Sequence, residues 1–407
     1  MEISIVSVHN QTDAGKLLKQ IGADTAGIRI MAPKAILHLV KINKLPNIAA
    51  NILKQESLSL GADTAVSRDA LTGKTRQTDC LVMGNLSQLN RLCDKLKRQP
   101  YGLSRVSHEL ECVLSNYQRR DFTVTAGDFK LNLNARTHIM GIINVTPDSF
   151  SGDGLYGEWQ IANGKWRLEN IIRQAEKMAA DGADIIDVGG ESSRPGARPV
   201  SVKEELQRVI PVIKILSKKI KVPISIDTYK SEVARQALAN GACIVNDITA
   251  LCGDVKMAKV VKKYKSAVVL MHMQGSPRNM QKNPRYTDVM NEIIEYLKRA
   301  INKALGAGVD FKKIIIDPGI GFGKTKEHNL EIIKRLNELR VLARPILIGT
   351  SRKSFIGKIL GCPPEERLFG TIASVCLAVI NGASIVRVHD VKEANQSLKV
   401  LDGIIRC

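Results

Sequence analysis

From His138 to the C-terminus, short apolar runs rich in Ile and Val alternate with longer amphipathic segments. The runs are continuous rather than alternating, which is typical of strands buried on both faces. They lie at 138–144, 183–188, 223–227, 242–247, 266–273, 313–317, 345–349 and 384–390. Eight β-then-α units in about 270 residues match a (β/α)8 barrel, or TIM barrel, in count and length. A doubly wound open sheet is the alternative, because the pattern does not reveal whether the sheet closes.

The segments between these runs predict the helices of the barrel. The clearest are 170–182, 231–241, 291–308 and 330–340, and several end on glycine, as a helix C-terminus often does. Ser201 and Glu204 have the spacing of a capping box at the start of the helix after the second strand.

Residues 1–134 lack this rhythm and predict a separate, smaller α+β domain, which leaves 135–407 for the barrel. Segments 32–42, 46–62 and 85–100 favour helices, and 78–84 favours a buried strand. Residues 121–135 predict a hairpin that turns on Ala126, Gly127 and Asp128. No catalytic constellation stands out here, and assembly or partner docking is the only role that suggests itself.

Each predicted barrel strand ends at a polar side chain, where barrel enzymes place their chemistry. An Asp after a strand is often only a helix cap or a turn former. Because all eight predicted strands end at a polar residue, the pattern favours a functional site over eight separate caps or turns. In strand order the residues are Asn144; Asp187; Asp227; Asn246 and Asp247; His272; Asp317; Thr350 to Lys353; and Arg387 with His389.

These side chains fall into two chemical groups. One is rich in hydrogen-bond acceptors and suits a ligand that presents several N–H groups; its members are Asp187, Asp227, Asn246 and Asp317. The other consists of donors or cations and suits an anion; its members are Asn144, Arg194, Lys353, Arg387 and His389. The pattern therefore predicts a small anionic substrate that combines an amino-bearing heterocycle with a phosphate-like group.

Two glycine-rich loops follow the second and sixth strands. In GIGFGKT (319–325), Pro318 stands where a phosphate-binding P-loop needs glycine, and Lys324 where a dinucleotide fingerprint needs it. We therefore expect a tight turn that brings backbone close to a ligand. GGESSRPGA (189–197) suits a loop that covers a substrate, with a purely structural turn as the competing interpretation.

The net charge, the targeting segments and the cysteine spacing restrict the kinds of ligand, partner and metal that we expect. The net charge of +20 divides into +7 over residues 1–136 and +13 over the rest, which favours anionic ligands. No Lys/Arg block is interleaved with aromatics, so we expect no nucleic-acid partner. Neither a signal peptide nor a transmembrane stretch is visible, which predicts a cytoplasmic protein without a membrane partner. Eight scattered cysteines without a CxxC pair favour buried thiols over a zinc site.

Taken in order, the strand-end motifs resemble the dihydropteroate synthase family over about residues 136–407. The motifs are MGIINVTPDSFSGDG, DVGGESSRPGA, SIDTYK, NDITA, MHMQG, IIIDPGIGFGK, GTSRKS and RVHDV. Ser193 stands where the family often has Thr, and Ile320 where it often has Phe; both departures leave the polar roles intact.

The resemblance implies condensation of 6-hydroxymethyl-7,8-dihydropterin diphosphate with 4-aminobenzoate, giving 7,8-dihydropteroate and diphosphate in folate biosynthesis. It implies a pterin set of Asp227, Asn246, Asp317 and Lys353 with Phe322 and Gly349, beside the acceptor Asp187. It places Asn144, Arg387 and His389 at the diphosphate, with Mg²⁺ on Asn144. It assigns Ser193, Arg194, Pro195 and Ser354 to aminobenzoate, with Asp153 in a loop that closes over it. The implied catalytic residues are Asp227, Asp317, Lys353, Arg387 and His389, and the implied assembly is a homodimer.

Two rival functions remain open at this stage. A pterin-binding methyltransferase barrel would use a similar Asp/Asn set, but it would need neither SRKS with RVHD nor the SSRPG loop. A non-catalytic pterin or nucleic-acid binding protein, with the N-terminal domain as its working part, is the rival from another class.

Overall fold

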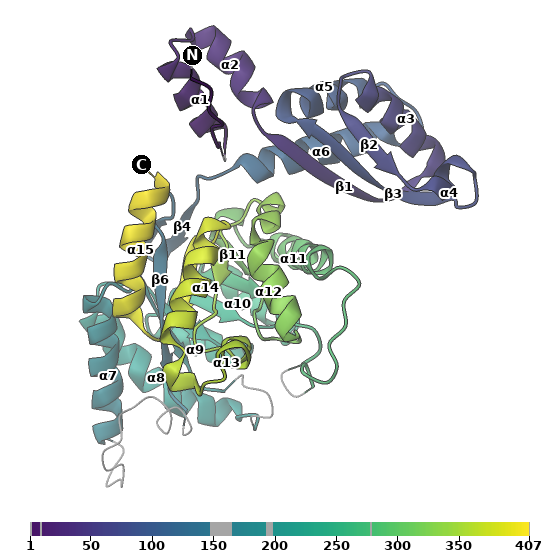
Figure 1. The fold of residues 1–407 in the computed structure, drawn as a ribbon. Coiled ribbons are helices and arrows are strands. Elements are labelled where there is room, and N and C mark those ends of the chain that lie inside the picture. The colour runs from purple at the N-terminus through teal and green to yellow at the C-terminus, as the bar shows by residue number, and fades with distance from the viewer. Residues whose placement is uncertain (1, 9, 147–164, 193–197, 277–278, 407) are drawn as a thin grey trace. The chain divides into compact units, whose positions relative to one another are not determined.

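The computed structural model describes residues 2–8, 10–146, 165–192, 198–276 and 279–406 (Figure 1). The chain forms two compact units, residues 1–118 and residues 119–407, and each is described by itself. The division falls earlier than the predicted boundary at 134/135, because the hairpin after residue 119 packs into the barrel.

The N-terminal unit has an α+β fold. Its antiparallel sheet has the order β1-β3-β2, formed by Leu37–Pro46, Gln77–Asn85 and Asp63–Val66. The helices are α1 (Gln11–Gln20), α2 (Thr25–Met31), α3 (Asn47–Leu58), α4 (Arg68–Leu71), α5 (Leu86–Leu96) and α6 (Leu103–Gln118), with a 3-10 turn at Ala32–Lys34. Leu53, Leu89 and Leu92 are fully buried in one apolar cluster. The expected helices at 46–62 and 85–100 and the strand at 78–84 are confirmed.

The helix predicted over residues 32–42 is wrong, because most of that segment forms strand β1. The short 3-10 turn ends at Lys34, and from Leu37 the side chains alternate between exposed and half-buried, as on a strand. Pairing with β3, in a register that sets Val40 opposite Val82, determines the conformation. Tertiary pairing thus overrides a local pattern that suits either element.

The second unit is a parallel eight-stranded barrel, as predicted (Figure 1). Its strands are β6 (His138–Asn144), β7 (Ile185–Gly189), β8 (Ile224–Asp227), β9 (Ile244–Asp247), β10 (Ala267–Met271), β11 (Ile314–Asp317), β12 (Leu347–Ile348) and β13 (Ile385–Val388). The sheet order runs from β11 back to β6 and on through β13 to β12. A parallel bridge between Ile316 and Ile346 joins the two outer strands, so the sheet closes and the open-sheet alternative is excluded.

Helices follow the strands around the barrel. They are α7 (Lys165–Ala180), α8 (Val202–Lys219), α9 (Ser231–Ala239), α10 (Met257–Lys263), α11 (Val289–Gly306), α12 (Lys326–Lys334), α13 (Ser354–Leu360), α14 (Leu368–Ile380) and α15 (Val391–Arg406). The helix expected at 330–340 is divided, since α12 ends at Lys334 and a 3-10 helix covers Leu336–Leu342. Ser201 caps α8 by accepting from the Glu204 N–H. In the described part of the chain, no helix is long and apolar enough to cross a membrane.

The predicted hairpin, β4 (Thr123–Ala126) and β5 (Phe129–Asn132), packs at the end of the barrel where its strands begin. Val124 and Leu131 share an apolar cluster with interior side chains such as Ile244, Ile315 and Ile385. Because alternate residues of a barrel strand point inward, the positions two residues further along face the same interior at its opposite end. Those positions are Asn246, Asp317 and Arg387, and Asp187 follows Ile185 in the same way.

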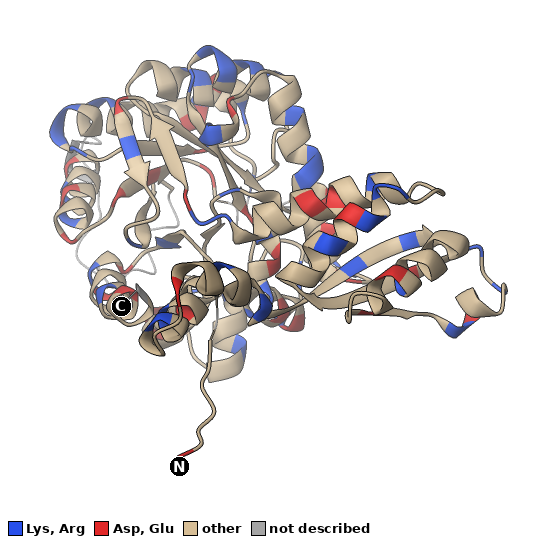
Figure 2. Cartoon of the chain, turned by 90° about the horizontal axis from the view of Figure 1, so that it is seen from above, with Lys and Arg blue, Asp and Glu red and all other residues tan. Residues whose placement is uncertain are grey.

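Charged side chains are distributed over many elements of the chain (Figure 2). Lys and Arg occur on helices throughout, and Asp and Glu lie among them. The charge excess is therefore not confined to one segment.

Candidate active site

A guanidinium group links three of the predicted site residues at the carboxyl ends of the strands. Arg387 Nε lies 2.7 Å from Asp187 Oδ2, and an Arg387 Nη atom lies 2.8 Å from Asp227 Oδ2. Asn246 Nδ2 also donates to Asp187 Oδ2, at 3.0 Å. Residues that are 200 positions apart in the chain thus meet across the barrel mouth.

One acceptor oxygen of this cluster has no hydrogen-bond donor among the described residues. Asp187 is fully buried, and no donor among the described residues reaches its Oδ1. A buried acceptor without a partner costs about 1–3 kcal/mol. A ligand N–H group would remove that cost.

Burial also shifts the titration of two predicted pterin ligands. It raises the pKa of Asp227 to about 7, against the opposing charge of Arg387. It raises the pKa of Asp317 to about 6, although the Gly319 N–H and then the charges of Lys353 and Arg387 lower it. Both carboxyls can therefore change charge near neutral pH, as groups in functional clefts often do.

Lys353 and Phe322 are in contact with each other. Lys353 Nζ lies 4.4 Å from the centre of the Phe322 ring, a cation–π contact. Phe322 belongs to an apolar cluster with Ile248, Met271 and Met273, which gives a flat ligand an apolar surface beside the acceptors. Gly349 lies next to Arg387, since a Cβ on it would meet the Arg387 Cβ at 3.6 Å.

The glycine-rich loop at 319–325 is a tight turn, as predicted, and its closest approach is to the end of β10. Gly319 has φ +69°, and a Cβ there would lie 1.9 Å from the His272 carbonyl oxygen, so no other residue fits. Lys324 Nζ lies 2.9 Å from His272 Nδ1 and 3.0 Å from the Phe322 carbonyl oxygen. Burial lowers the pKa of His272 to about 2. His272 therefore supports this loop from within the protein.

The strand-end Asp247 has the structural role that such residues often have. It is fully buried, and its carboxylate accepts from Thr249 N, Thr249 Oγ1 and Leu251 N at 2.7–2.9 Å. These contacts shape the turn after β9. The polar residues at the strand ends therefore have different roles, and their hydrogen-bond partners distinguish one role from another.

The structure describes three of the remaining predicted residues, and the others lie outside the described residues. His389 Nδ1 lies 3.0 Å from Ser351 Oγ, and Ser354 is exposed at the first position of α13. Asn144 ends β6, and its Oδ1 lies 3.8 Å from the point where a Cβ on Gly189 would sit, close to Asp227. Asp153, Ser193, Arg194 and Pro195 lie outside the described residues.

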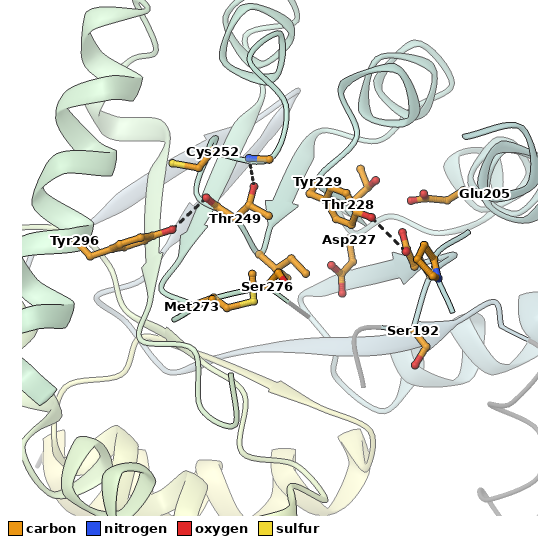
Figure 3. Close-up of a pocket in the computed structure, with 15 residues that line it drawn as sticks. Ser192, Glu205, Asp227, Thr228, Tyr229, Thr249, Cys252, Met273, Ser276 and Tyr296 are labelled. Carbon is orange, nitrogen blue, oxygen red and sulfur yellow. Dashed lines mark hydrogen bonds between the residues drawn. The ribbon is translucent and has the colours of Figure 1, made fainter. Parts of the chain in front are cut away.

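A cavity of about 450 Å³ adjoins the cluster (Figure 3). Asp227, Thr228 and Tyr229 line one side, and Thr249, Cys252 and Tyr296 line another. Its walls also include Glu191 and Glu205, which sequence reasoning did not single out. Both bind Lys230, the last residue of the SIDTYK motif, and Glu191 itself lies in the DVGGESSRPGA motif.

The barrel and its polar mouth define a pterin-binding enzyme, and the family model described as "Pterin binding enzyme" matches residues 140–389. Dihydropteroate synthase of Synechocystis is 47% identical over 272 residues, covering 67% of this chain and 91% of that protein. The structure of dihydropteroate synthase from Clostridium difficile, solved in the presence of pteroic acid, matches with a TM-score of 0.61 and 49% identity. It covers 67% of this chain and 98% of that one. The chain belongs to the dihydropteroate synthase family.

Its function is accordingly that of a dihydropteroate synthase, a transferase of folate biosynthesis. It condenses 6-hydroxymethyl-7,8-dihydropterin diphosphate with 4-aminobenzoate to give 7,8-dihydropteroate and diphosphate.

One relative also covers the N-terminal unit. A probable bifunctional folylpolyglutamate synthase/dihydropteroate synthase of Halobacterium salinarum is 39% identical over 400 residues, or 97% of this chain and 46% of that protein. The match to this Halobacterium salinarum protein therefore extends over the N-terminal unit as well as the barrel.

Proposed function

We propose that the Arg387-centred cluster performs this synthase reaction by holding the pterin with its acidic and amide side chains. Asp187, Asp227, Asn246 and Asp317 accept from the N–H groups of the pterin, and Lys353 and Phe322 flank the ring. The observation that carries the proposal is the buried Asp187 Oδ1, which has no donor within the described residues. The pteroic acid of the Clostridium difficile structure supports this choice of ligand.

Arg387 and His389 are assigned to the diphosphate. In the reaction, the bond between the pterin CH₂ carbon and the diphosphate oxygen breaks, and negative charge develops on the leaving group. Arg387 and His389 stabilise that charge. Loss of diphosphate leaves cationic character on the CH₂ carbon, which the carboxylates of Asp227 and Asp317 favour by proximity.

Mg²⁺ is proposed as a cofactor at the same end. Within the described residues, no group of three or more His, Cys, Asp or Glu side chains is placed to hold a metal. Mg²⁺ that arrives with phosphates needs only one or two protein oxygens, and it keeps several waters. The Asn144 amide oxygen fits that role, and the ion would neutralise charge on the diphosphate.

The second substrate needs positioning more than activation. The amine of 4-aminobenzoate is neutral at pH 7, so its nitrogen lone pair can attack the CH₂ carbon without a strong base. The N–C bond forms at the cationic carbon that the departing diphosphate leaves, and the nitrogen then loses its extra proton to water or to the released diphosphate. We assign Ser193, Arg194 and Pro195, with the exposed Ser354, to holding the aminobenzoate in line.

A homodimer is proposed on the exposed apolar surface of the last two helices. Phe369 and Ile380 of α14 are 84% and 57% exposed, and Val400 and Ile404 of α15 are 65% and 66% exposed. Large apolar side chains exposed on neighbouring helices favour an interaction surface there. Sedimentation of the full chain tests the proposed homodimer.

A cytoplasmic location of the protein stays a prediction.

The assignment is tested by following both products. With pterin diphosphate and 4-aminobenzoate present together, we expect diphosphate and dihydropteroate in equal amounts. A pterin-binding methyltransferase would release no diphosphate from this pair. Asp187→Asn should weaken binding of the pterin substrate, and unchanged pterin affinity would contradict the role given to Asp187.

A further inference from the structure

The loop after β12 and the loop after β13 are joined by side-chain contacts at the barrel mouth. Arg352 Nη2 lies 2.7 Å from Asp390 Oδ1, and Arg352 Nε lies 3.2 Å from Asp390 Oδ2. Beside this pair, Ser351 Oγ lies 3.0 Å from His389 Nδ1 and accepts from the His389 N–H at 3.3 Å. The two loops therefore meet through a bidentate ion pair and through the contacts of Ser351 with His389.

Asp390 does not have the role that its place in the chain suggests. It directly precedes α15, where an Asp side chain often caps the helix by accepting from a backbone N–H. Within the described part of the chain, its carboxylate accepts instead from the Arg352 guanidinium alone. The side chains of Arg352 and Asp390 are only 20% and 19% exposed, so solvent screens the pair weakly.

The backbone of Arg352 is also fixed. Arg352 has φ +56°, a left-handed conformation that a residue with a side chain rarely adopts unless its surroundings hold it there. Its N–H donates to Oγ1 of the buried Thr371 at 3.0 Å, and its carbonyl oxygen accepts from Arg367 Nη1 at 3.0 Å. Both backbone groups and the guanidinium of Arg352 therefore have set partners.

Each member of the ion pair is next in sequence to a residue that we assign to one half of the same substrate. Lys353 follows Arg352 and contacts the Phe322 ring, beside which we place the pterin. Asp390 follows His389, which we assign to the diphosphate. The pair thus connects the chain segments that hold the two halves of pterin diphosphate.

We propose that Asp390 is a positioning residue for the diphosphate-bearing pterin. By holding Arg352, it fixes the spacing between Lys353 and His389, and it acts without touching the substrate. A ligand held at two points gains from both contacts only when the protein keeps their spacing. The inference rests on the proposed assignments of Lys353 to the pterin and of His389 to the diphosphate.

The test compares the whole substrate with its two halves in the full chain. Asp390→Asn removes the charge with little change of shape. At saturating 4-aminobenzoate, kcat/KM for pterin diphosphate should fall by about tenfold or more, since misplaced binding groups can cost up to about 100-fold. In calorimetric titrations, the affinities for the pterin without diphosphate and for diphosphate alone should each stay within about twofold, because each half binds to one segment whose own groups are intact.

Two further variants serve as controls. Asp390→Glu keeps the carboxylate and should restore part of the lost kcat/KM. Asp184→Asn is the matched control, because Asp184 also forms a bidentate ion pair, with Arg136, at the end of the barrel where the strands begin. It should leave kcat/KM for pterin diphosphate unchanged, whatever it does to stability.

A purely structural ion pair gives a different result. Asp390→Asn would then lower the melting temperature and leave kcat/KM unchanged, or weaken binding of either half as much as it weakens the whole substrate. Either outcome overturns the proposal. If Asp390→Asn does not fold, Arg352→Gln breaks the same pair from the other side and decides by the same criteria.

His389→Ala separates this inference from the function on which it rests. If His389→Ala leaves the affinity for diphosphate alone unchanged, the assignment of His389 is itself wrong. If His389→Ala lowers that affinity and Asp390→Asn leaves kcat/KM unchanged, only the role of Asp390 is wrong.

Discussion

The two ends of the barrel are made by inward-facing side chains of the same strands, yet one end is apolar and the other is polar. Where the strands begin, Ile244, Ile315 and Ile385 pack against the β4–β5 hairpin in a buried apolar cluster. Two residues further along the same strands stand Asn246, Asp317 and Arg387. One end is closed by apolar packing, and the other keeps buried polar groups, to which we assign the ligand.

This difference carries an energetic cost at the polar end. Burial raises the pKa of Asp227 and of Asp317, so each carboxylate is less stable there than in water. The apolar end has no such penalty, and each large side chain buried there contributes about 1.5–3 kcal/mol. Substitutions at the polar end should therefore affect turnover, and those at the apolar end should affect stability.

The largest effect is expected for Lys353→Ala. It removes the cation that contacts Phe322 and that lowers the pKa of Asp317. We expect turnover to fall by more than about 100-fold, the scale of losing one preorganised charged group, with the melting temperature little changed. Steady-state kinetics with thermal unfolding checks both. Near-native activity would show that Lys353 lies outside the reaction site.

The next largest effect is expected for Arg387→Ala. Its guanidinium bridges Asp187 and Asp227, and we assign it to the diphosphate. Affinity for the diphosphate-bearing substrate and for free diphosphate should fall by roughly 10–100-fold. Equilibrium dialysis with labelled diphosphate measures this directly. An unchanged diphosphate affinity would contradict the role of Arg387.

Substitutions in the hairpin should show the reverse pattern. Leu131→Ala should lower the free energy of unfolding by about 2–4 kcal/mol and leave both KM values unchanged. A chain that starts at Arg119 should fold and be active, whereas one that starts at Arg136 lacks the hairpin and should be far less stable. Equal stability of the two truncations would show that the hairpin does not close the barrel.

The smallest effect is expected from pH. With pKa values near 7 and 6, Asp227 and Asp317 lose their negative charge as the pH falls from 8 to 5.5. Neutral carboxyls are weaker acceptors, so affinity for a pterin without diphosphate should fall several-fold over that range. Calorimetric titration at several pH values measures it. A flat profile would mean that neither carboxylate accepts from the pterin.

The sequence alone predicted the barrel because strands buried on both faces leave a strong signal, and all eight runs became strands. It failed over residues 32–42, where pairing between β1 and β3 rather than local pattern decides the conformation. Strand ends predicted the residues of the proposed site, but they did not separate Asp187, whose Oδ1 has no donor among the described residues, from Asp247, whose carboxylate shapes a turn. Lys230 and Glu191 lie in motifs that the sequence analysis marked, but the pattern did not show that these two residues, 39 positions apart, form an ion pair.

The central claim is that the acidic half of the polar end holds the pterin. Calorimetric titration of a pterin without diphosphate into the wild-type chain and into Asp317→Ala tests it most directly. The account predicts that affinity falls by at least about tenfold in the variant while its melting temperature is maintained. Equal affinity in a folded variant would contradict it.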